Sequence, residues 1–302
     1  MKLLKGIFSP IPTPFDQNGE ILFDKLTSNL ELWADQPLNG VVMPGSNSEA
    51  ASMAHEERTQ IWKKCVSVLD SAGKTLIAGT GVETTKETIE LTKEAADIGA
   101  AAALVIPPYF YKPKMTHEVL MAHFTELAEN SPINILLYNV PQFTGVDFSL
   151  KTIIALADHP KIVGIKDTSI NLLKMASLLA ARPEFKVFAG TASALLPYLS
   201  LGCVGGIMAL ANIAPGPLKQ ILEDFKAGDW ESAREGQLKL VEINAAVTSI
   251  FGVPGLKYAM DQLGLFGGFP RRPLLPLNES GKLEIDTLIR KVNLKSLIRT
   301  GE

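Results

Sequence analysis

The chain has 302 residues, of which 46% are hydrophobic and 20% are charged, and its formal net charge is −3. This length and composition allow a large core, either in two ordinary domains or in one α/β barrel. The charged residues form no basic run, which argues against nucleic acid as a partner. No stretch has the apolar length of a membrane span, and the N-terminus lacks the apolar region of a signal peptide. We therefore expect a soluble, cytoplasmic protein without a membrane partner.

Short apolar runs alternate with longer amphipathic segments as far as about residue 225. The runs predict strands centred near Ile7, Val41, Ile77, Leu104, Leu136, Val163, Val187 and Gly206. The segments between them predict helices at residues 23–33, 56–69, 86–98, 117–129, 150–157, 172–180 and 194–199. Strands and helices that alternate without a change of composition are typical of a (β/α)8 barrel, a TIM barrel. A doubly wound sheet ranks second, because no GxGxxG motif follows the first strand.

Beyond Gly228 the pattern becomes purely helical, with candidate helices at residues 229–251, 255–264 and 284–297. We therefore predict two parts. Residues 1–228 would form a catalytic barrel, and residues 229–302 would form a C-terminal helical extension. The expected role of the extension is to pack against the barrel or a neighbouring subunit.

The cysteines and histidines predict neither a disulfide framework nor a metal site. The chain contains two cysteines, Cys65 and Cys203, which are too few for a disulfide framework at this length. The histidines form no pair with the spacing of an HxH or HExxH metal motif. We therefore expect no metal at the functional site.

The sixth predicted strand ends in a lysine. Residues 162–165 form a short apolar run of the kind found in buried parallel strands, and Lys166 follows them. In a barrel, the C-terminal ends of the strands form the mouth at which active sites lie. A partly desolvated amine at this place can attack a ketone and form a Schiff base. Lys166 is therefore the candidate nucleophile, although a solvated lysine at a strand end is the alternative.

Other predicted strands end in residues that would meet Lys166 at the same mouth. The turn at residues 45–49 follows the second strand, and its hydroxyl and backbone N–H groups suit a carboxylate. Tyr138 ends the fifth strand, where a phenol can act as general acid and base. Gly190 follows the seventh strand and allows close backbone approach. Each feature alone also fits an ordinary turn or a packing residue.

In this order, the motifs resemble the dihydrodipicolinate synthase and N-acetylneuraminate lyase family of Schiff-base aldolases. The matching segments are residues 12–15, 45–49, 138–141 with 144–145, and 164–167. The resemblance implies a TIM barrel with a C-terminal helical extension and a homotetramer or homodimer. It also implies that pyruvate or another 2-oxo acid is bound as an imine, without a metal or an organic cofactor, and that an aldehyde is the second small-molecule partner.

The resemblance also implies roles for individual residues. The expected catalytic residues are Lys166 as the Schiff-base nucleophile, Tyr138 as the proton shuttle, and Ser46. The expected substrate-binding residues are Ser46, Asn47, Thr168, Gly190 and Ile207. Ser46 and Asn47 would hold the substrate carboxylate or relay protons, and Thr168 would contact the distal part of the substrate.

Three positions depart from the family's pattern. Phe143 stands where true dihydrodipicolinate synthases carry an arginine that binds the carboxylate of the aldehyde substrate, and a phenyl ring cannot make that contact. Phe110 stands at the second relay tyrosine, so Tyr109 or Tyr111 would have to replace it. Ser48 stands where the 4-hydroxy-2-oxoglutarate aldolase branch usually has glycine, and it would narrow the carboxylate pocket or shift the turn.

The missing arginine and the segment at residues 244–268 resemble the 4-hydroxy-2-oxoglutarate aldolases most closely. We therefore predict a class I aldolase that cleaves a 4-hydroxy-2-oxo acid, first of all 4-hydroxy-2-oxoglutarate, to pyruvate and an aldehyde such as glyoxylate. The alternative is 4-hydroxy-tetrahydrodipicolinate synthase or another lyase or dehydratase of the same family. A barrel that binds pyruvate without turnover is a further alternative, and the histidine pattern disfavours a metal-dependent aldolase.

Overall fold

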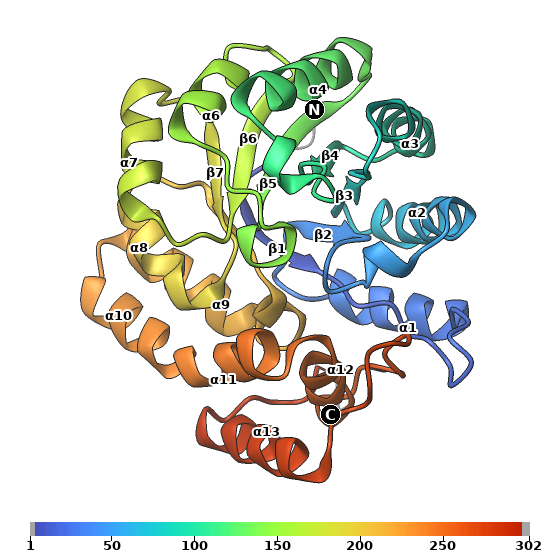
Figure 1. Cartoon of the computed structure of the whole chain (residues 1–302). Coiled ribbons are helices and arrows are strands. Elements are labelled where there is room, and N and C mark those ends of the chain that lie inside the picture. Colours follow the sequence, from blue (N-terminus) through green and yellow to red (C-terminus); the bar gives the residue numbers. More distant parts are fainter. Residues whose placement is uncertain (1–3, 298–302) are drawn as a thin grey trace.

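A computed structural model describes residues 4–297 of the chain. Eight parallel strands close into a barrel in the order of the chain, which confirms the predicted TIM-barrel architecture (Figure 1). The strands are β1 (Gly6–Pro10), β2 (Gly40–Met43), β3 (Thr75–Gly79), β4 (Ala102–Val105), β5 (Asn134–Asn139), β6 (Ile162–Asp167), β7 (Lys186–Ala189) and β8 (Gly205–Ile207). Each strand contains the centre of one predicted apolar run.

Helices surround the barrel in Figure 1 and cover the outer faces of its strands. Those that match a predicted segment to within one residue at each end are α1 (Phe23–Ala34), α2 (His55–Leu69), α3 (Thr85–Ile98), α4 (His117–Asn130), α6 (Leu150–Leu156), α7 (Leu172–Ala181) and α8 (Leu195–Ser200). Those that were not predicted are α5 (Pro141–Thr144), α9 (Pro215–Ala227) and the short 3₁₀ segments η1 (Ala50–Ser52), η2 (Lys112–Lys114), η3 (Ala192–Ala194) and η4 (Ala209–Asn212). Most of these are too short to show a helical period in the sequence.

The strand side chains alternate between two apolar cores. One core lies inside the barrel and includes Tyr138, whereas the other lies between the strands and the helices and includes Leu137 and Ile165. Successive side chains of a strand point to opposite faces. Because Ile165 points outward, Lys166 points into the barrel, and it shares that interior with Tyr138.

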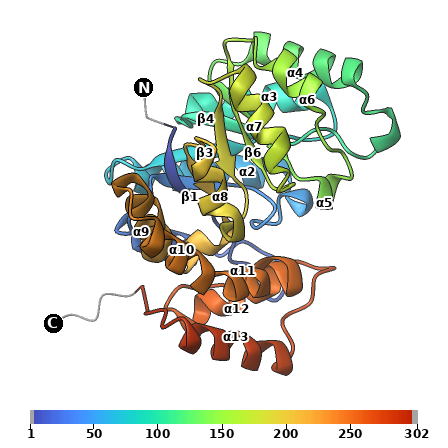
Figure 2. The same cartoon turned by 90° about the vertical axis from the view of Figure 1, so that its left-hand side faces the viewer.

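The C-terminal helices pack as a group beside the barrel, as the orange and red ribbons of Figures 1 and 2 show. They are α10 (Trp230–Lys239), α11 (Val241–Ala245), the π-helical segment η5 (Ala246–Ile250), α12 (Gly252–Gln262) and α13 (Glu279–Lys291). The predicted helix at residues 229–251 is therefore divided, and α13 begins at Glu279 rather than at residue 284. Gly252, the first residue of α12, has a φ of 58°, a left-handed conformation that glycine adopts readily, and it marks the break after η5.

The two cysteines lie apart in the fold as single buried side chains. Cys65 and Cys203 are free and buried, and burial raises the pKa of each thiol to about 12. Among residues 4–297, no group of three or more His, Cys, Asp or Glu side chains could hold a metal ion. Within the same residues, no helix is long and apolar enough to cross a membrane.

His123 should make folding stability depend on pH. It lies on α4 with 5% exposure, and its Nδ1 is 2.8 Å from the hydroxyl of Thr85. Burial lowers the pKa of His123 from 6.5 to about 4. Between these values the unfolded chain binds a proton that the folded chain does not. The contribution of this group to the free energy of unfolding therefore falls by about 2 kcal/mol between pH 7 and pH 5.

This prediction is checked by urea unfolding of the native chain and His123→Gln at both pH values. The variant should lose that part of the pH dependence, whereas His159→Gln, a histidine outside α4, should keep it. An unchanged pH dependence in His123→Gln would contradict the account.

Candidate active site

Lys166 and Tyr138 lie side by side inside the barrel, at the C-terminal ends of β6 and β5. The two residues are paired in the register of these strands. Their side chains are 4% and 5% exposed, and the Lys166 Nζ lies 4.0 Å from the centre of the Tyr138 ring. Within residues 4–297 no carboxylate forms an ion pair with this amine. The structure thus brings the predicted nucleophile and the predicted proton shuttle together and leaves the amine available to a substrate.

Ser46 connects Tyr138 to the turn that follows β2. Its Oγ lies 2.9 Å from the Tyr138 hydroxyl, and either oxygen can donate the hydrogen bond. A proton can therefore move between the two groups. Asn47 is adjacent, but its amide donates to the carbonyl oxygen of Pro10 at 3.3 Å. This hydrogen bond directs the Asn47 amide toward the segment after β1.

Ser48 acts on the shape of this turn. Its side chain is fully buried, donates to the carbonyl oxygen of Ile11, and accepts a hydrogen bond from the Gly45 N–H at 3.0 Å. Its carbonyl oxygen accepts a hydrogen bond from the Thr13 hydroxyl at 2.9 Å. The serine that stands in place of glycine therefore fastens the turn to the segment after β1.

The other predicted site residues follow or end neighbouring strands. The Thr168 hydroxyl lies 2.9 Å from the carbonyl oxygen of Asn139 and 3.0 Å from the side-chain oxygen of Gln142. A Cβ at Gly190 would lie only 2.2 Å from the Thr168 methyl carbon, so a larger residue does not fit there. Ile207 ends β8 and is fully buried in the core inside the barrel.

Sequence reasoning missed a pair of residues that holds β5 and β6 together behind the site. Asn139 and Asp167 directly follow Tyr138 and Lys166, so their side chains point out of the barrel. The Asn139 amide donates to the Asp167 carboxylate at 2.7 Å, and both residues are fully buried. Tyr198 of α8 donates to the same carboxylate, and burial and this negative charge raise the pKa of Tyr198. The signal in the sequence was a polar residue directly after each candidate catalytic residue.

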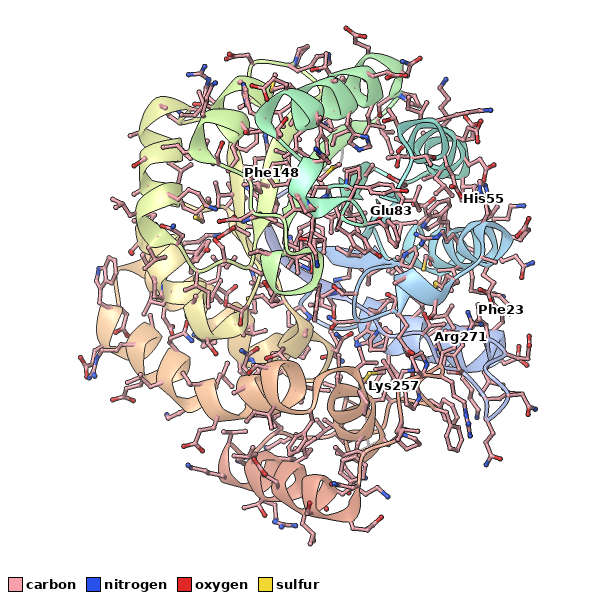
Figure 3. The ribbon with its side chains drawn as sticks, viewed as in Figure 1. Phe23, His55, Glu83, Phe148, Lys257 and Arg271 are labelled. Atoms are coloured by element: carbon pink, nitrogen blue, oxygen red, sulfur yellow. The ribbon has the colours of Figure 1, made fainter. Side chains whose placement is uncertain are left out.

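The loop after β4 places no tyrosine against Tyr138. Phe110 and Tyr111 are 72% and 68% exposed, and their rings pack edge to face. The backbone N–H groups of Tyr109 and Phe110 donate to the carboxylate of Glu83, which is labelled in Figure 3, at 3.1 and 2.9 Å. Within the described chain the Tyr138 hydroxyl is bonded to Ser46, and neither Tyr109 nor Tyr111 reaches it. In the described chain, the hydrogen-bond partner of the Tyr138 hydroxyl is therefore Ser46.

Comparison with known proteins places the chain in a family. The profile of the dihydrodipicolinate synthetase family matches residues 3–292. The chain belongs to this family. It is 33% identical over 293 residues to a 4-hydroxy-tetrahydrodipicolinate synthase of an Exiguobacterium species, covering 96% of this chain and 99% of the relative. It is 36% identical over 285 residues to the enzyme of that name from Methanococcoides burtonii, covering 93% and 96%.

Solved structures agree with this assignment. The dihydrodipicolinate synthase of Bacillus anthracis is 30% identical, with a TM-score of 0.91 over 96% of this chain and 99% of the other. A dihydrodipicolinate synthase of Acinetobacter baumannii, solved in complex with pyruvate, is 32% identical, with a TM-score of 0.91 over 97% and 100%.

Family membership confirms the predicted enzyme class. Enzymes of this family are class I aldolases that form a lysine Schiff base with pyruvate and need no cofactor, so the chain is a carbon–carbon lyase of that type. The narrower assignment to the 4-hydroxy-2-oxoglutarate branch has no such support. The relatives described above are named for the synthase reaction, which was the alternative in the sequence analysis.

Proposed function

We propose that Lys166 binds pyruvate as a Schiff base and that Tyr138, together with Ser46, transfers the protons of the reaction. The observation that carries the proposal is the position of the Lys166 Nζ, 4.0 Å from the centre of the Tyr138 ring. The hydroxyl of that ring is 2.9 Å from Ser46. These two contacts support a nucleophile, a proton donor and a relay at the mouth of the barrel.

The chemistry follows from these positions. The Lys166 nitrogen attacks C2 of pyruvate, and loss of one water gives the imine. The protonated imine withdraws electrons from C3, which loses a proton and becomes the nucleophilic carbon of an enamine. This carbon attacks the aldehyde, and Tyr138 supplies the proton that turns the aldehyde oxygen into a hydroxyl. Hydrolysis of the imine then releases the product, and the reverse sequence cleaves a 4-hydroxy-2-oxo acid.

The other predicted residues would bind the substrate. The turn at residues 45–49 would bind the pyruvate carboxylate through the Ser46 hydroxyl, backbone N–H groups and the second N–H of the Asn47 amide, since the first donates to Pro10. Gly190 and Ile207 would line the site with their backbones. Thr168 would contact the aldehyde end, because its hydroxyl lies next to Gln142 of α5.

The first candidate for the complete reaction is condensation of pyruvate with aspartate semialdehyde, as in a 4-hydroxy-tetrahydrodipicolinate synthase. The names of the curated relatives support it, since their alignments cover 96% and 93% of this chain. The likeness to solved dihydrodipicolinate synthases supports it as well.

The second candidate is cleavage of 4-hydroxy-2-oxoglutarate to pyruvate and glyoxylate. One observation favours it: Phe143 lies on α5 with 70% exposure, where an arginine would bind the carboxylate of aspartate semialdehyde. An exposed phenyl ring offers that carboxylate no hydrogen bond. The carboxylate of glyoxylate is attached to the reacting carbon itself, so it does not need a partner on α5.

Phe143→Arg should separate the two candidates. If the native chain cleaves 4-hydroxy-2-oxoglutarate, the variant should gain activity with pyruvate and aspartate semialdehyde, because a charge-assisted contact contributes about 1.5 to 3 kcal/mol. Initial rates with each substrate check this, with Phe143→Lys as the matched charge control. A native chain that already prefers aspartate semialdehyde would establish the first candidate and exclude the second.

Other features of the protein remain proposals. A homotetramer or homodimer is supported by the exposed apolar side chains of Phe110, Tyr111 and Leu173. A division between a catalytic barrel and a helical extension is supported by Gly228, which ends α9 with a left-handed backbone conformation. A cytoplasmic location is proposed from the sequence analysis.

A further inference from the structure

A buried ion pair joins the C-terminal helices to the turn that carries Ser46. Lys257, in the middle of α12, places its Nζ 2.7 Å from the carboxylate of Glu49, and the two side chains are 1% and 4% exposed. The same ammonium donates to the carbonyl oxygen of Phe269 at 2.6 Å. Burial lowers the pKa of Lys257, and the charge of Glu49 opposes this effect. The Lys257 ammonium thus contacts the turn after β2 through Glu49 and the segment after α12 through Phe269, and we call this contact region the junction.

Arg271 completes the junction from the segment after α12. Its backbone N–H donates to the Glu49 carboxylate at 2.6 Å, and its guanidinium pairs with Glu57 of α2. The guanidinium and the Lys257 ammonium lie 4.2 and 4.7 Å from the centre of the buried Phe15 ring. Figure 3 labels Lys257 and Arg271 where the C-terminal part of the chain meets the N-terminal part. Both carboxylate oxygens of Glu49 therefore contact the C-terminal extension, one through Lys257 and the other through Arg271.

Glu49 is part of the same short turn as Ser46. Its backbone is left-handed, with a φ of 64°, which is uncommon for a residue other than glycine. The Glu49 N–H donates to the carbonyl oxygen of Ser46 at 3.1 Å. A change in the position of Glu49 is therefore transmitted directly to Ser46, whose hydroxyl meets Tyr138.

We propose that Lys257 is a positioning residue of the active site. Through Glu49 it fixes the turn at residues 45–49 and holds the Ser46 hydroxyl against Tyr138. The helical extension is then part of the catalytic apparatus rather than packing alone. This inference rests on the proposed function, in which Tyr138 and Ser46 transfer protons.

The test is Lys257→Met, which keeps the linear side chain and removes its charge. The matched control is Lys291→Met, which removes the ammonium of an exposed ion pair with Glu242 in the same extension. We expect kcat of Lys257→Met to fall about ten- to a hundredfold, because small displacements of a catalytic group cost about that much. The pH profile of kcat should change as well. Borohydride should still trap pyruvate at saturating concentration, because Lys166 is untouched, and Lys291→Met should behave like the native chain.

The double variant Glu49→Gln/Lys257→Met separates positioning from stability. Removing one partner leaves a buried charge without compensation, whereas removing both does not. The melting temperature should therefore recover in the double variant while kcat stays low, and the double variant carries the test if Lys257→Met alone does not fold. Recovery of both the melting temperature and kcat in the double variant would overturn the inference. A native kcat and pH profile in Lys257→Met would overturn it as well. Failure of the native chain to trap pyruvate would instead overturn the proposed function.

Discussion

Replacing Lys166 by alanine should reduce turnover to the uncatalysed background, because without the amine no imine forms with the 2-oxo acid. The folded structure should survive, since the amine holds no ion pair within the described residues and contacts the Tyr138 ring at the open end of the barrel. Steady-state rates measure the first effect. Far-ultraviolet circular dichroism and the melting temperature measure the second.

A matched control comes from the next strand. Lys186 begins β7, at the opposite end of the barrel from the site, so Lys186→Ala should keep a turnover close to that of the native chain. Measurable turnover in a folded Lys166→Ala variant would contradict the proposed nucleophile. An equal loss in both variants would show that the effect is not specific to Lys166.

Tyr138→Phe should lower kcat by about two to four orders of magnitude, which is the usual contribution of a general acid or base. The variant keeps the aromatic ring beside Lys166 and removes only the hydroxyl that forms a 2.9 Å hydrogen bond with Ser46. Imine formation with pyruvate should persist, so borohydride should still trap the adduct. Single-turnover measurements with the hydroxy-oxo acid or the aldehyde locate the affected step.

Tyr258→Phe is the matched control for this prediction. Its hydroxyl contacts Asp286 of α13 at 3.1 Å, away from the barrel mouth, so the variant should retain native rates. A loss of kcat of less than tenfold in Tyr138→Phe would contradict the proton-transfer role of Tyr138. Ser46 would then be the next candidate for that role.

The sequence was sufficient to predict the barrel and to predict that Lys166 and Tyr138 lie together at its mouth. Parallel strands buried on both faces have short apolar runs, which stand out between amphipathic helices. Strand ends meet at one mouth in a barrel, so Lys166 and Tyr138 could be placed together before any coordinates were known. The alternation of side chains also explains why Asn139 and Asp167, one position further along, lie outside the barrel and hold the strands together.

The junction at Lys257 could not be predicted in the same way. A lysine in a helix usually extends into solvent, and only the fold shows that Lys257 faces Glu49 from a distant part of the chain. The likeness to the 4-hydroxy-2-oxoglutarate aldolase branch was also insufficient to assign the reaction. It depended on a few positions such as Phe143 and Ser48, whereas similarity along the whole chain leads to relatives named for the synthase reaction.

The most direct test of the central claim is the intact mass of the protein after incubation with pyruvate and borohydride, for the native chain and Lys166→Ala. The account predicts one stable adduct of reduced pyruvate in the native chain and none in the variant. Fragmentation should place the adduct at Lys166. An unmodified native chain, or equal labelling of both proteins, would contradict the claim that Lys166 is the Schiff-base nucleophile.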